Sequence, residues 1–429
     1  MDEVIEVNKI DEIKKRSAVE IPSSKSYTNR ALIIASLVDG KTILHNPLYS
    51  DDTKYMMESL EKIGVVFEKN NKDLVVYGNG GNFALENDNV ELFCGMAGTT
   101  SRFLTGLLAL MDTNVVINGE GKILERPIGE LVEGLRQIGV KIDYLGKTGS
   151  LPLRGNGKSI GFAGNHNEIS MNGGVSSQYF TALMMVAPLL KNGLTINVID
   201  KQVSSSYIDM TIDIMKTFGV DVVNKNYKQY VIEPAKYRAV EYSAEGDWSS
   251  ASYFCCLGAL FDGGIEVANV NNNSVQGDKN FVELLKQMGA EVKYCTDSVF
   301  VRGRNLKPID VDMKLMPDAA VSLAVLLSFV DGKSKITGLS TLKNKESDRL
   351  MALHNELKKL SIDTEIGDDF IIIYGGKPKV VGEIETYNDH RIAMSFAIAG
   401  AKLGGLKIKN PAVVSKSFPD FWNCLNKLR

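Results

Sequence analysis

One short motif recurs along the chain and limits the folds open to it. Four amphipathic segments end in glycine followed by Val or Ala, as LEKIGV, LRQIGV, MKTFGV and LKQMGA. Their glycines, at positions 64, 139, 219 and 289, are spaced by 75, 80 and 70 residues, and glycine suits the left-handed conformation that closes a helix. A weaker copy, LKKLSI, lies at residues 357–362. Self-similarity at this period indicates one supersecondary unit used several times.

Each copy has the same order of predicted elements. A Gly-, Ser- or Asp-rich segment leads into an apolar helix and a short strand, which are followed by a polar turn, a second helix and a hairpin-like pair of strands. The sequence therefore predicts six copies of an α/β unit. Their first helices are expected to begin near Ser24, Gly98, Gly174, Gly246, Pro317 and Asn388.

The two ends of the chain suggest how the copies form domains. The sixth copy stops at Leu428, directly after its second helix, whereas residues 4–21 hold two strand-like runs outside any complete copy. We expect this N-terminal segment to supply the strands that the sixth copy lacks. One domain would then be continuous over residues 21–243, and the other would combine residues 1–20 with 244–429. Two crossings with little slack suit a hinge, so the active site is expected in a cleft between these domains.

Composition and charge exclude several classes of function. The chain of 429 residues is 44% hydrophobic and 24% charged, as expected for a globular protein of two domains. A net charge of -3 gives no support for nucleic-acid or membrane binding, and no apolar run is long enough to span a bilayer. Acidic residues directly after Met1 argue against a signal peptide. Five scattered cysteines without C-x-x-C and four separated histidines indicate reduced thiols, no metal site and a cytoplasmic protein.

The start of the first copy, residues 22–37, combines a buried helical face with a cluster of polar side chains. Its sequence, PSSKSYTNRALIIASL, places Ser, Lys, Thr, Asn and Arg ahead of apolar residues at helical spacing. A helix N-terminus presents unpaired N–H groups and partial positive charge, so hydroxyls together with Lys25 and Arg30 would bind an anion there. An ordinary Ser-capped helix is the alternative.

Cations recur at equivalent positions of the six copies, at the start of the first helix and in the turn before the second. A surface lined by them fits small ligands with phosphate and carboxylate groups, whereas surface ion pairs are the alternative for any single arginine. Asp318 and Glu346 are candidate proton carriers or helix caps, and Lys25 is a third candidate because nearby cations could lower its pKa. The eight cations are Lys25, Arg30, Arg102, Arg126, Lys345, Arg349, Arg391 and Lys416.

Two nucleotide-binding motifs are absent. Each GK[ST] triplet lacks the glycine five residues earlier that a P-loop requires, and GxGxxG follows no predicted strand. Cys255 and Cys256 lie in an apolar helix and are expected to be core residues.

Nine motifs together resemble the 5-enolpyruvylshikimate-3-phosphate synthase family: PSSKSYTNR, GMAGTTSR, ERPIG, GGVSSQYFTAL, EGDWSSASYF, PDAA, KESDRL, NDHRIAM and SKSFPDFW. The resemblance covers the whole chain and implies two domains, each of three βαβαββ copies. It implies a transferase that moves the carboxyvinyl group of phosphoenolpyruvate to the 5-hydroxyl of shikimate 3-phosphate and releases phosphate, in the shikimate route to aromatic amino acids. No metal or organic cofactor is implied. The expected partners are these two small molecules, with no nucleic acid or membrane, and a monomer is expected.

The resemblance also implies roles for single residues. Asp318 would accept the proton of the attacking hydroxyl with help from Lys25, and Glu346 would donate a proton to the methylene carbon. Shikimate 3-phosphate would be bound by Lys25, Ser26, Arg30, Ser176, Ser177, Gln178, Ser204, Tyr207, Asp318 and Lys345. Phosphoenolpyruvate would be bound by Lys25, Gly98, Arg126, Gln178, Arg349, Arg391 and Lys416.

Two positions depart from the family pattern, and two other functions stay open. Met96 and Thr341 stand where many members have Asn, so the family's asparagine contacts to phosphoenolpyruvate and to shikimate 3-phosphate are not carried over to these two positions. A sister enzyme that acts on UDP-N-acetylglucosamine shares the fold, but its usual loop cysteine has no counterpart near Arg126. A non-catalytic repeat scaffold or anion-binding protein is the other alternative.

Overall fold

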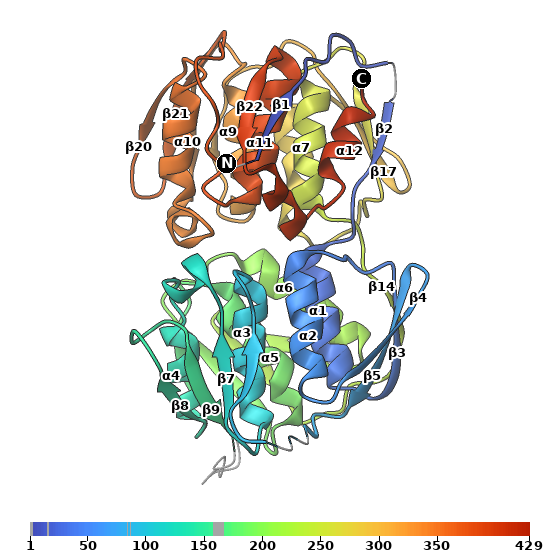
Figure 1. Ribbon diagram of the computed structural model, residues 1–429, viewed down its shortest axis with the longest axis vertical. Helices are drawn as coiled ribbons and strands as arrows, with labels where there is room; N and C mark the ends of the chain where they lie inside the picture. The colour runs from blue at the N-terminus through green and yellow to red at the C-terminus, as the bar shows by residue number, and fades with distance from the viewer. Residues whose placement is uncertain (1–2, 15–16, 84, 86, 158–166) are drawn as a thin grey trace. The chain divides into compact units, whose positions relative to one another are not determined.

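The chain divides into two units that each contain half of the repeats. The computed structural model describes residues 3–14, 17–83, 85, 87–157 and 167–429. Unit 1 comprises Met1–Pro22 and Glu245–Arg429, and unit 2 comprises Ser23–Ala244. The chain therefore passes between the units twice, as the colours of Figure 1 allow the reader to follow.

Unit 2 holds three four-stranded sheets of identical order. In each sheet an outer strand pairs in parallel with the next strand, which pairs antiparallel with the second strand of a hairpin. This confirms the predicted α/β copies. The strands, in spatial order, are β14 (Glu241–Ser243), β3 (Asp39–His45), β5 (Asp73–Asn79) and β4 (Val66–Asn70); β6 (Val90–Phe93), β7 (Val115–Asn118), β9 (Leu153–Asn156) and β8 (Lys141–Tyr144); and β10 (Glu168–Asn172), β11 (Leu194–Ile199), β13 (Gln229–Ile232) and β12 (Val223–Asn224).

Unit 1 has two sheets with the same strand order and a third sheet with fewer strands. The two four-stranded sheets have the same parallel and antiparallel pairs as unit 2, and the third sheet contains two strands. In spatial order they are β2 (Ser17–Glu20), β15 (Ile265–Ala268), β17 (Ser298–Arg302) and β16 (Glu291–Tyr294); β18 (Asp310–Asp312), β19 (Gly332–Thr337), β21 (Ile371–Gly375) and β20 (Asp363–Ile366); and β1 (Val4–Val7) with β22 (Leu406–Lys409).

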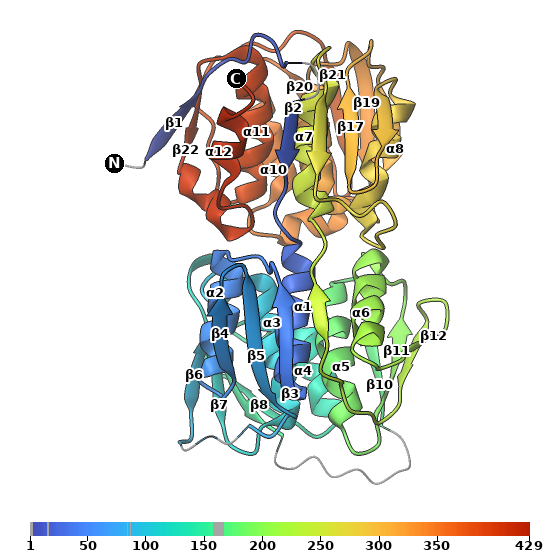
Figure 2. The ribbon, with the colours of Figure 1, turned by 90° about the vertical axis from the view of Figure 1, so that its right-hand side faces the viewer.

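The two N-terminal strands join different copies, which corrects half of the sequence prediction. β1 pairs antiparallel with β22 of the sixth copy, as predicted, and lies beside it in Figure 2. β2 does not join this sheet; it pairs in parallel with β15 of the fourth copy. The reason is that β14, which immediately precedes the fourth copy along the chain, pairs with β3 in unit 2. The fourth copy therefore takes its outer strand from the N-terminal segment.

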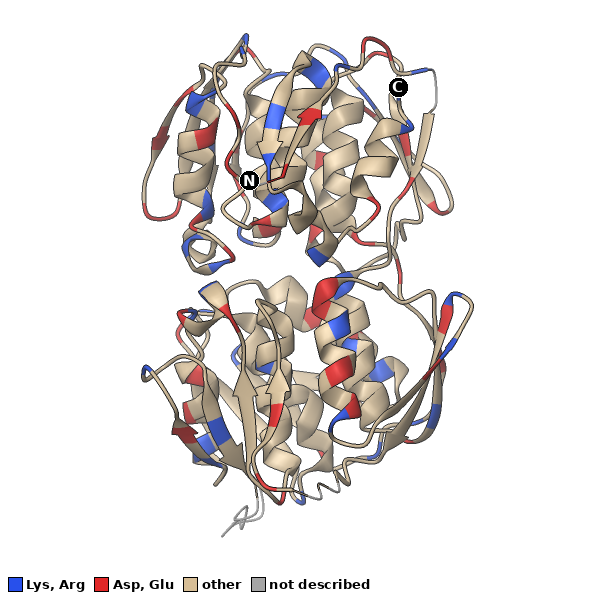
Figure 3. Cartoon of the chain, in the orientation of Figure 1, with Lys and Arg blue, Asp and Glu red and all other residues tan. Residues whose placement is uncertain are grey.

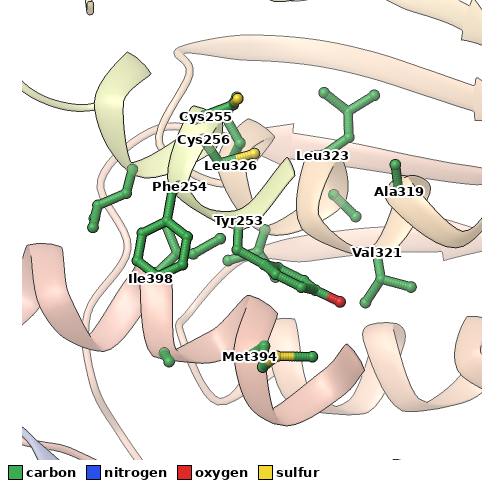
Figure 4. Close-up of a cluster of buried hydrophobic side chains, with 14 of the residues drawn as sticks. Tyr253, Phe254, Cys255, Cys256, Ala319, Val321, Leu323, Leu326, Met394 and Ile398 are labelled. Atoms are coloured by element: carbon green, nitrogen blue, oxygen red, sulfur yellow. The ribbon is translucent and has the colours of Figure 1, made fainter. Parts of the chain in front are cut away.

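The first helices of the copies form the core of each unit. In unit 1, α7, α9 and α11 contact one another, and Figure 4 shows Phe254, Leu323 and Met394 from these three helices in one apolar cluster. α5, α7 and α9 carry no charged residue, and Figure 3 shows charges mainly on other helices, strands and loops. Cys255 and Cys256 are buried there, as predicted. The helices are α1 (Lys25–Ser36), α2 (Asp51–Glu61), α3 (Gly98–Leu107), α4 (Gly129–Gln137), α5 (Ser177–Val186), α6 (Ser205–Thr217), α7 (Trp248–Ala259), α8 (Phe281–Gln287), α9 (Ala320–Leu327), α10 (Arg349–Lys358), α11 (His390–Leu403) and α12 (Phe421–Asn426).

The repeated glycines close the second helices, as the motif predicted. Gly64, Gly139, Gly219 and Gly289 have φ angles of 92°, 92°, 85° and 105°. In the weaker copy the same position holds Ser361, with φ of 59°. The first four copies therefore have glycine, which tolerates the left-handed conformation, whereas the fifth copy has serine, for which this conformation is unfavourable.

Candidate functional site

Hydrogen bonds join the N-terminal ends of four helices in unit 2. Lys25, the first residue of α1, forms an ion pair with Asp52 in α2, with 2.9 Å between Nζ and Oδ2. The backbone carbonyl of Asp52 accepts a hydrogen bond from Thr100 in the first turn of α3. Thr99 in that turn accepts one from the side-chain amide of Gln178 in α5. Helix N-termini that meet in this way combine their partial positive charges, as an anion site requires.

Arg30 is buried in α1 and links this helix to α6. Its Nε donates to Thr211 at 2.9 Å, and its two terminal nitrogens donate to the carbonyls of Ser26 at 2.9 Å and Tyr207 at 3.1 Å. Burial lowers the pKa of Arg30 to about 10, so the guanidinium stays charged at neutral pH. The Arg30 guanidinium therefore joins Ser26 and Tyr207, and all three residues are predicted to bind shikimate 3-phosphate.

Two more arginines lie against the start of α3. Arg102 is buried and donates to the carbonyls of Gly98 at 3.2 Å and Pro127 at 2.8 Å. Burial, followed by the charge of Arg126, lowers the pKa of Arg102 to about 10. A Cβ atom at Gly98 would lie 2.5 Å from Nη1 of Arg126. Glycine at this position thus lets Arg126 lie directly against the helix start.

The serines predicted to bind the shikimate phosphate lie at the starts of α5 and α6. Ser176 caps α5 and accepts a hydrogen bond from the backbone N–H of Gln178 at 3.3 Å, and Ser177 is the first residue of that helix. Ser204 precedes α6 in a left-handed conformation, with φ of 51°. Its carbonyl accepts a hydrogen bond from the backbone of Tyr207 at 3.1 Å. Ser176 therefore holds the start of α5 through its hydroxyl, whereas Ser204 holds the start of α6 through its backbone carbonyl.

Asp318 is the centre of a cluster of ion pairs in unit 1. Its Oδ1 lies 2.9 Å from Nη1 of Arg349 and 3.2 Å from Nζ of Lys345. Its Oδ2 lies 3.1 Å from Nη2 of Arg391. Burial opposes ionisation of Asp318, but these cations outweigh burial and hold the pKa of its carboxyl well below its usual range. The predicted proton acceptor is therefore ionised at neutral pH.

Arg349 connects this cluster to two further carboxylates. It is 1% exposed, and its Nη2 donates to Oε2 of Glu346 at 2.8 Å, whereas its Nε donates to Oδ2 of Asp389 at 2.7 Å. Burial alone would lower the pKa of Arg349, but Asp389, Glu346 and Asp318 outweigh burial and raise it. Both predicted proton carriers, Asp318 and Glu346, therefore share one guanidinium.

Arg391 brings α11 into this cluster, and Lys416 lies on an element that contacts α11. Arg391 is in the first turn of α11, and its Nη1 donates to the hydroxyl of buried Tyr253 at 3.2 Å. Lys416 is buried at the end of η7 (Pro411–Lys416), which contacts α11. Asp389 caps α11 by accepting from the backbone of Arg391 at 3.0 Å. Asp389 is not among the predicted site residues, although its place directly before an apolar helix is the usual signal of a cap.

A second buried acid in unit 1 also had no predicted role. Asp278, in η4 (Gly277–Asn280), accepts a hydrogen bond from the hydroxyl of Ser249 through Oδ2. Its Oδ1 is buried and has no hydrogen-bond partner among the residues that the structure describes. Burial, followed by the charge of Asp318, raises the pKa of Asp278 to about 7. Asp278 therefore holds a proton under conditions in which Asp318 does not.

The two positions that depart from the family pattern differ in environment. Met96 is 37% exposed in the turn before α3. Thr341 lies in η6 (Ser340–Asn344), and its hydroxyl oxygen is buried without a hydrogen-bond partner in the described part of the chain.

The described residues hold neither a cluster of metal ligands nor a membrane-spanning helix. No group of three or more His, Cys, Asp and Glu side chains within ranges 3–14, 17–83, 85, 87–157 and 167–429 could hold a metal ion. None of the helices built from these same residues is long and apolar enough to cross a membrane.

Comparison with known proteins identifies the family. The family model described as EPSP synthase (3-phosphoshikimate 1-carboxyvinyltransferase) matches residues 8–425. The chain belongs to the EPSP synthase family. Relatives named 3-phosphoshikimate 1-carboxyvinyltransferase include those of Shewanella amazonensis, 42% identical over 408 residues and 94% of both chains, and Citrobacter koseri, 40% identical over 414 residues and 96% of both chains. A solved EPSP synthase from Acinetobacter baumannii is similar with a TM-score of 0.81 and 25% identity, over 99% of this chain and 98% of that one.

The EPSP synthase assignment confirms the resemblance and the predicted fold class. Within unit 2 the structure brings together the helix starts that carry Lys25, Gly98 and Gln178. Within unit 1 it joins Asp318 and Glu346 through Arg349. Unit 2 thus contains a cluster rich in hydroxyls and helix N-termini, and unit 1 contains a cluster rich in ion pairs.

Proposed function

We propose that this chain transfers the carboxyvinyl group of phosphoenolpyruvate to the 5-hydroxyl of shikimate 3-phosphate, giving 5-enolpyruvylshikimate 3-phosphate and phosphate. The family model and relatives named for this activity, which match nearly the whole chain, support the reaction. The observation that carries the assignment within the structure is the cluster in which Asp318 contacts Arg349, Lys345 and Arg391. Cations around an acid suit a reaction that moves protons while phosphate leaves.

Shikimate 3-phosphate is assigned mainly to the helix starts of unit 2. Hydroxyls and backbone N–H groups at the starts of α5 and α6 can complete the oxygens of a phosphate, and Lys25 and Arg30 supply charge. Asp318 and Lys345, in unit 1, are the two remaining residues that we propose to bind this substrate. The unit 2 residues are Lys25, Ser26, Arg30, Ser176, Ser177, Gln178, Ser204 and Tyr207.

The residues proposed to bind phosphoenolpyruvate are mostly cations. Its phosphate and carboxylate groups would be held by arginines, which can bind each group with two N–H donors. Gly98 lets the Arg126 side chain lie at the start of α3, where backbone N–H groups add to the site. The proposed residues are Lys25, Gly98, Arg126, Gln178, Arg349, Arg391 and Lys416.

Protons move in both stages of the proposed reaction. In the addition, Asp318 accepts the proton of the 5-hydroxyl with help from Lys25, that oxygen bonds to the central carbon of phosphoenolpyruvate, and Glu346 donates a proton to the methylene carbon. In the elimination, the new methyl group returns a proton to the Glu346 carboxylate, the double bond forms again, and phosphate leaves with the proton that Asp318 had accepted. An anionic substrate that takes hydrogen bonds from Arg349 and Arg391 would weaken their hold on Asp318. The pKa of Asp318 would then rise, so substrate binding itself would make Asp318 a better base.

The proposed function is tested by phosphate release from phosphoenolpyruvate in the presence of shikimate 3-phosphate. We expect release with this acceptor and none with UDP-N-acetylglucosamine. Asp318→Asn and Glu346→Gln should each lower kcat at least about a hundredfold, because each removes a proton carrier. Both variants should still bind shikimate 3-phosphate in calorimetry, since most of its proposed contacts lie in unit 2.

A matched control separates these roles from a general effect of lost charge. Asp368 forms an exposed ion pair with Lys343 in the same unit, at 2.8 Å, so Asp368→Asn should leave turnover unchanged. Phosphate release only with UDP-N-acetylglucosamine would overturn the proposed reaction. Unchanged turnover in Asp318→Asn and Glu346→Gln would instead overturn the proposed roles of these two acids.

A further inference from the structure

The loop before α11 is held by α10 at two points. Asp389, at the end of this loop, accepts hydrogen bonds from Arg349 at 2.7 and 3.1 Å. Tyr387, two residues earlier, donates through its hydroxyl to Oε1 of Glu356 at 2.7 Å. Arg349 and Glu356 are seven residues apart in α10 and therefore lie on one face of the helix, two turns apart. One rigid helix thus fixes both ends of the segment that leads into Arg391.

Glu356 in α10 is completely buried, which is unusual for a glutamate. Its exposed fraction is 0%, and its carboxylate accepts four hydrogen bonds. Two come from Nζ of Lys359 at 3.0 and 2.8 Å, one from the hydroxyl of Tyr387 and one from the backbone N–H of Glu385 at 2.9 Å. Buried carboxylates persist only where such donors compensate for lost water. Two of the three donor groups belong to the loop, so Glu356 and the loop depend on each other.

The loop backbone has an unfavourable conformation that these contacts maintain. Tyr387 and Asn388 are consecutive residues with φ of 54° and 55°. Tyrosine rarely adopts the left-handed region, and residues held there often cluster at functional sites. The turn ends where the backbone N–H of Asp389 donates to the carbonyl of Thr386 at 2.8 Å. This geometry aims the chain directly into α11, whose second residue is Arg391.

A side-chain hydrogen bond connects the same loop to the segment that carries Lys416. The amide of Asn410 donates to Oδ1 of Asn388 at 2.7 Å. Asn410 is itself left-handed, with φ of 46°, and immediately precedes η7, which ends at Lys416. Two left-handed asparagines thus join the starts of α11 and η7. The loop therefore has contacts to the elements that carry Arg349, Arg391 and Lys416.

We propose that Glu356, Tyr387, Asn388 and Asn410 form a positioning network that sets the spacing of the three cations assigned to phosphoenolpyruvate in unit 1. The proposal rests on the proposed function and deepens it. These four residues act through Arg349, Arg391 and Lys416 and do not touch substrate. Arginine pairs recognise phosphate and carboxylate only at fixed separations, so loosening the network should weaken phosphoenolpyruvate binding more than shikimate 3-phosphate binding.

The first test uses variants that remove one link each. Tyr387→Phe deletes only the hydroxyl, and Asn388→Gly deletes the amide while glycine keeps the left-handed backbone without strain. Each variant should raise KM for phosphoenolpyruvate about three- to tenfold, because a lost hydrogen bond misplaces charged groups. KM for shikimate 3-phosphate should stay unchanged. Tyr387→Phe removes one donor to buried Glu356 and should therefore also lower the melting temperature, so the rise in KM for phosphoenolpyruvate alone is the decisive result. A merely structural role would instead change both KM values together.

Matched control variants exist elsewhere in the chain. Tyr374 donates its hydroxyl to Glu365 at 2.5 Å in an exposed hairpin, so Tyr374→Phe deletes the same kind of bond away from the loop. Asn71 has φ of 56° in an exposed turn between β4 and β5, so Asn71→Gly is the matched control for Asn388→Gly. Both controls should leave both KM values unchanged.

Hydrogen exchange by mass spectrometry gives a readout that does not depend on turnover. Tyr387→Phe should increase exchange in residues 385–391 and 410–416, and leave residues 25–30 unchanged. Unchanged KM for phosphoenolpyruvate in active Tyr387→Phe and Asn388→Gly proteins would overturn the network. If the unaltered chain failed to release phosphate, the proposed function would fall. In that case the exchange pattern alone would decide whether the loop links the two segments.

Discussion

At the scale of single residues, Asp278 makes the stability of unit 1 depend on pH. Burial raises the pKa of Asp278 from 3.8 to about 7. The folded chain therefore binds a proton that the unfolded chain releases between these values, so stability falls as pH rises from about 4 to about 7 and is then constant. Asp278→Asn keeps a hydrogen-bond acceptor for Ser249 but cannot ionise, so it removes this loss of stability. Each pKa unit corresponds to about 1.4 kcal/mol, so the variant should gain on the order of 4 kcal/mol above pH 7.

Intrinsic fluorescence can measure this effect because both tryptophans, Trp248 and Trp422, belong to unit 1. Urea unfolding of both proteins at pH 5 to 8 should give a stability difference that grows with pH and levels off near pH 7. A difference that stays the same at all pH values would show that Asp278 is not the titrating group.

At the scale of elements, the second helices offer a comparison between copies. Ser361 and Gly289 occupy equivalent left-handed positions, and the backbone N–H of each donates to a lysine carbonyl at 3.0 Å. Ser361→Gly should stabilise unit 1 by roughly 0.5–1 kcal/mol, because relief of the left-handed strain exceeds the entropy that glycine adds to the unfolded chain. Gly289→Ser should destabilise it by about 1–2 kcal/mol. Both values can be read from urea unfolding followed by tryptophan fluorescence.

The control is that Ser361→Gly and Gly289→Ser should change the free energy of unfolding in opposite directions. If Ser361→Gly were destabilising, the helix end would depend on a contact of the serine side chain and not on backbone conformation. The copies would then not be equivalent at this position.

At the scale of the whole molecule, the N-terminal strand should stabilise one unit only. Val7 is 2% exposed, and a Cβ atom at Gly400 of α11 would lie 2.6 Å from Cβ of Val7, so β1 packs closely on this helix. Deletion of residues 1–8 removes these contacts and the antiparallel partner of β22. The melting temperature of unit 1 should fall by roughly 4–10 °C, because a few kcal/mol of burial are lost.

Calorimetry combined with hydrogen exchange checks this deletion. Exchange should increase in β22 and remain unchanged in β3 and β5, which belong to unit 2. Equal loss of protection in both units would contradict the division of the chain into separately stabilised parts.

The sequence by itself determined the repeated unit, its helix-closing glycines and the residue types of the candidate site. These features are local: a glycine at a helix end or a serine at a helix start acts through its own backbone. The family resemblance added the reaction because its motifs are specific combinations of such local features.

Only the tertiary structure decided which strand completes which sheet and which charges pair. β2 joins β15 because β14 is already paired with β3, and neither partner is adjacent in sequence. Likewise, Asp318 meets Arg391, and Glu356 meets Tyr387, across separations of 73 and 31 residues. Such pairings and the pKa shifts that follow depend on distance and burial, which are set by packing of the whole unit.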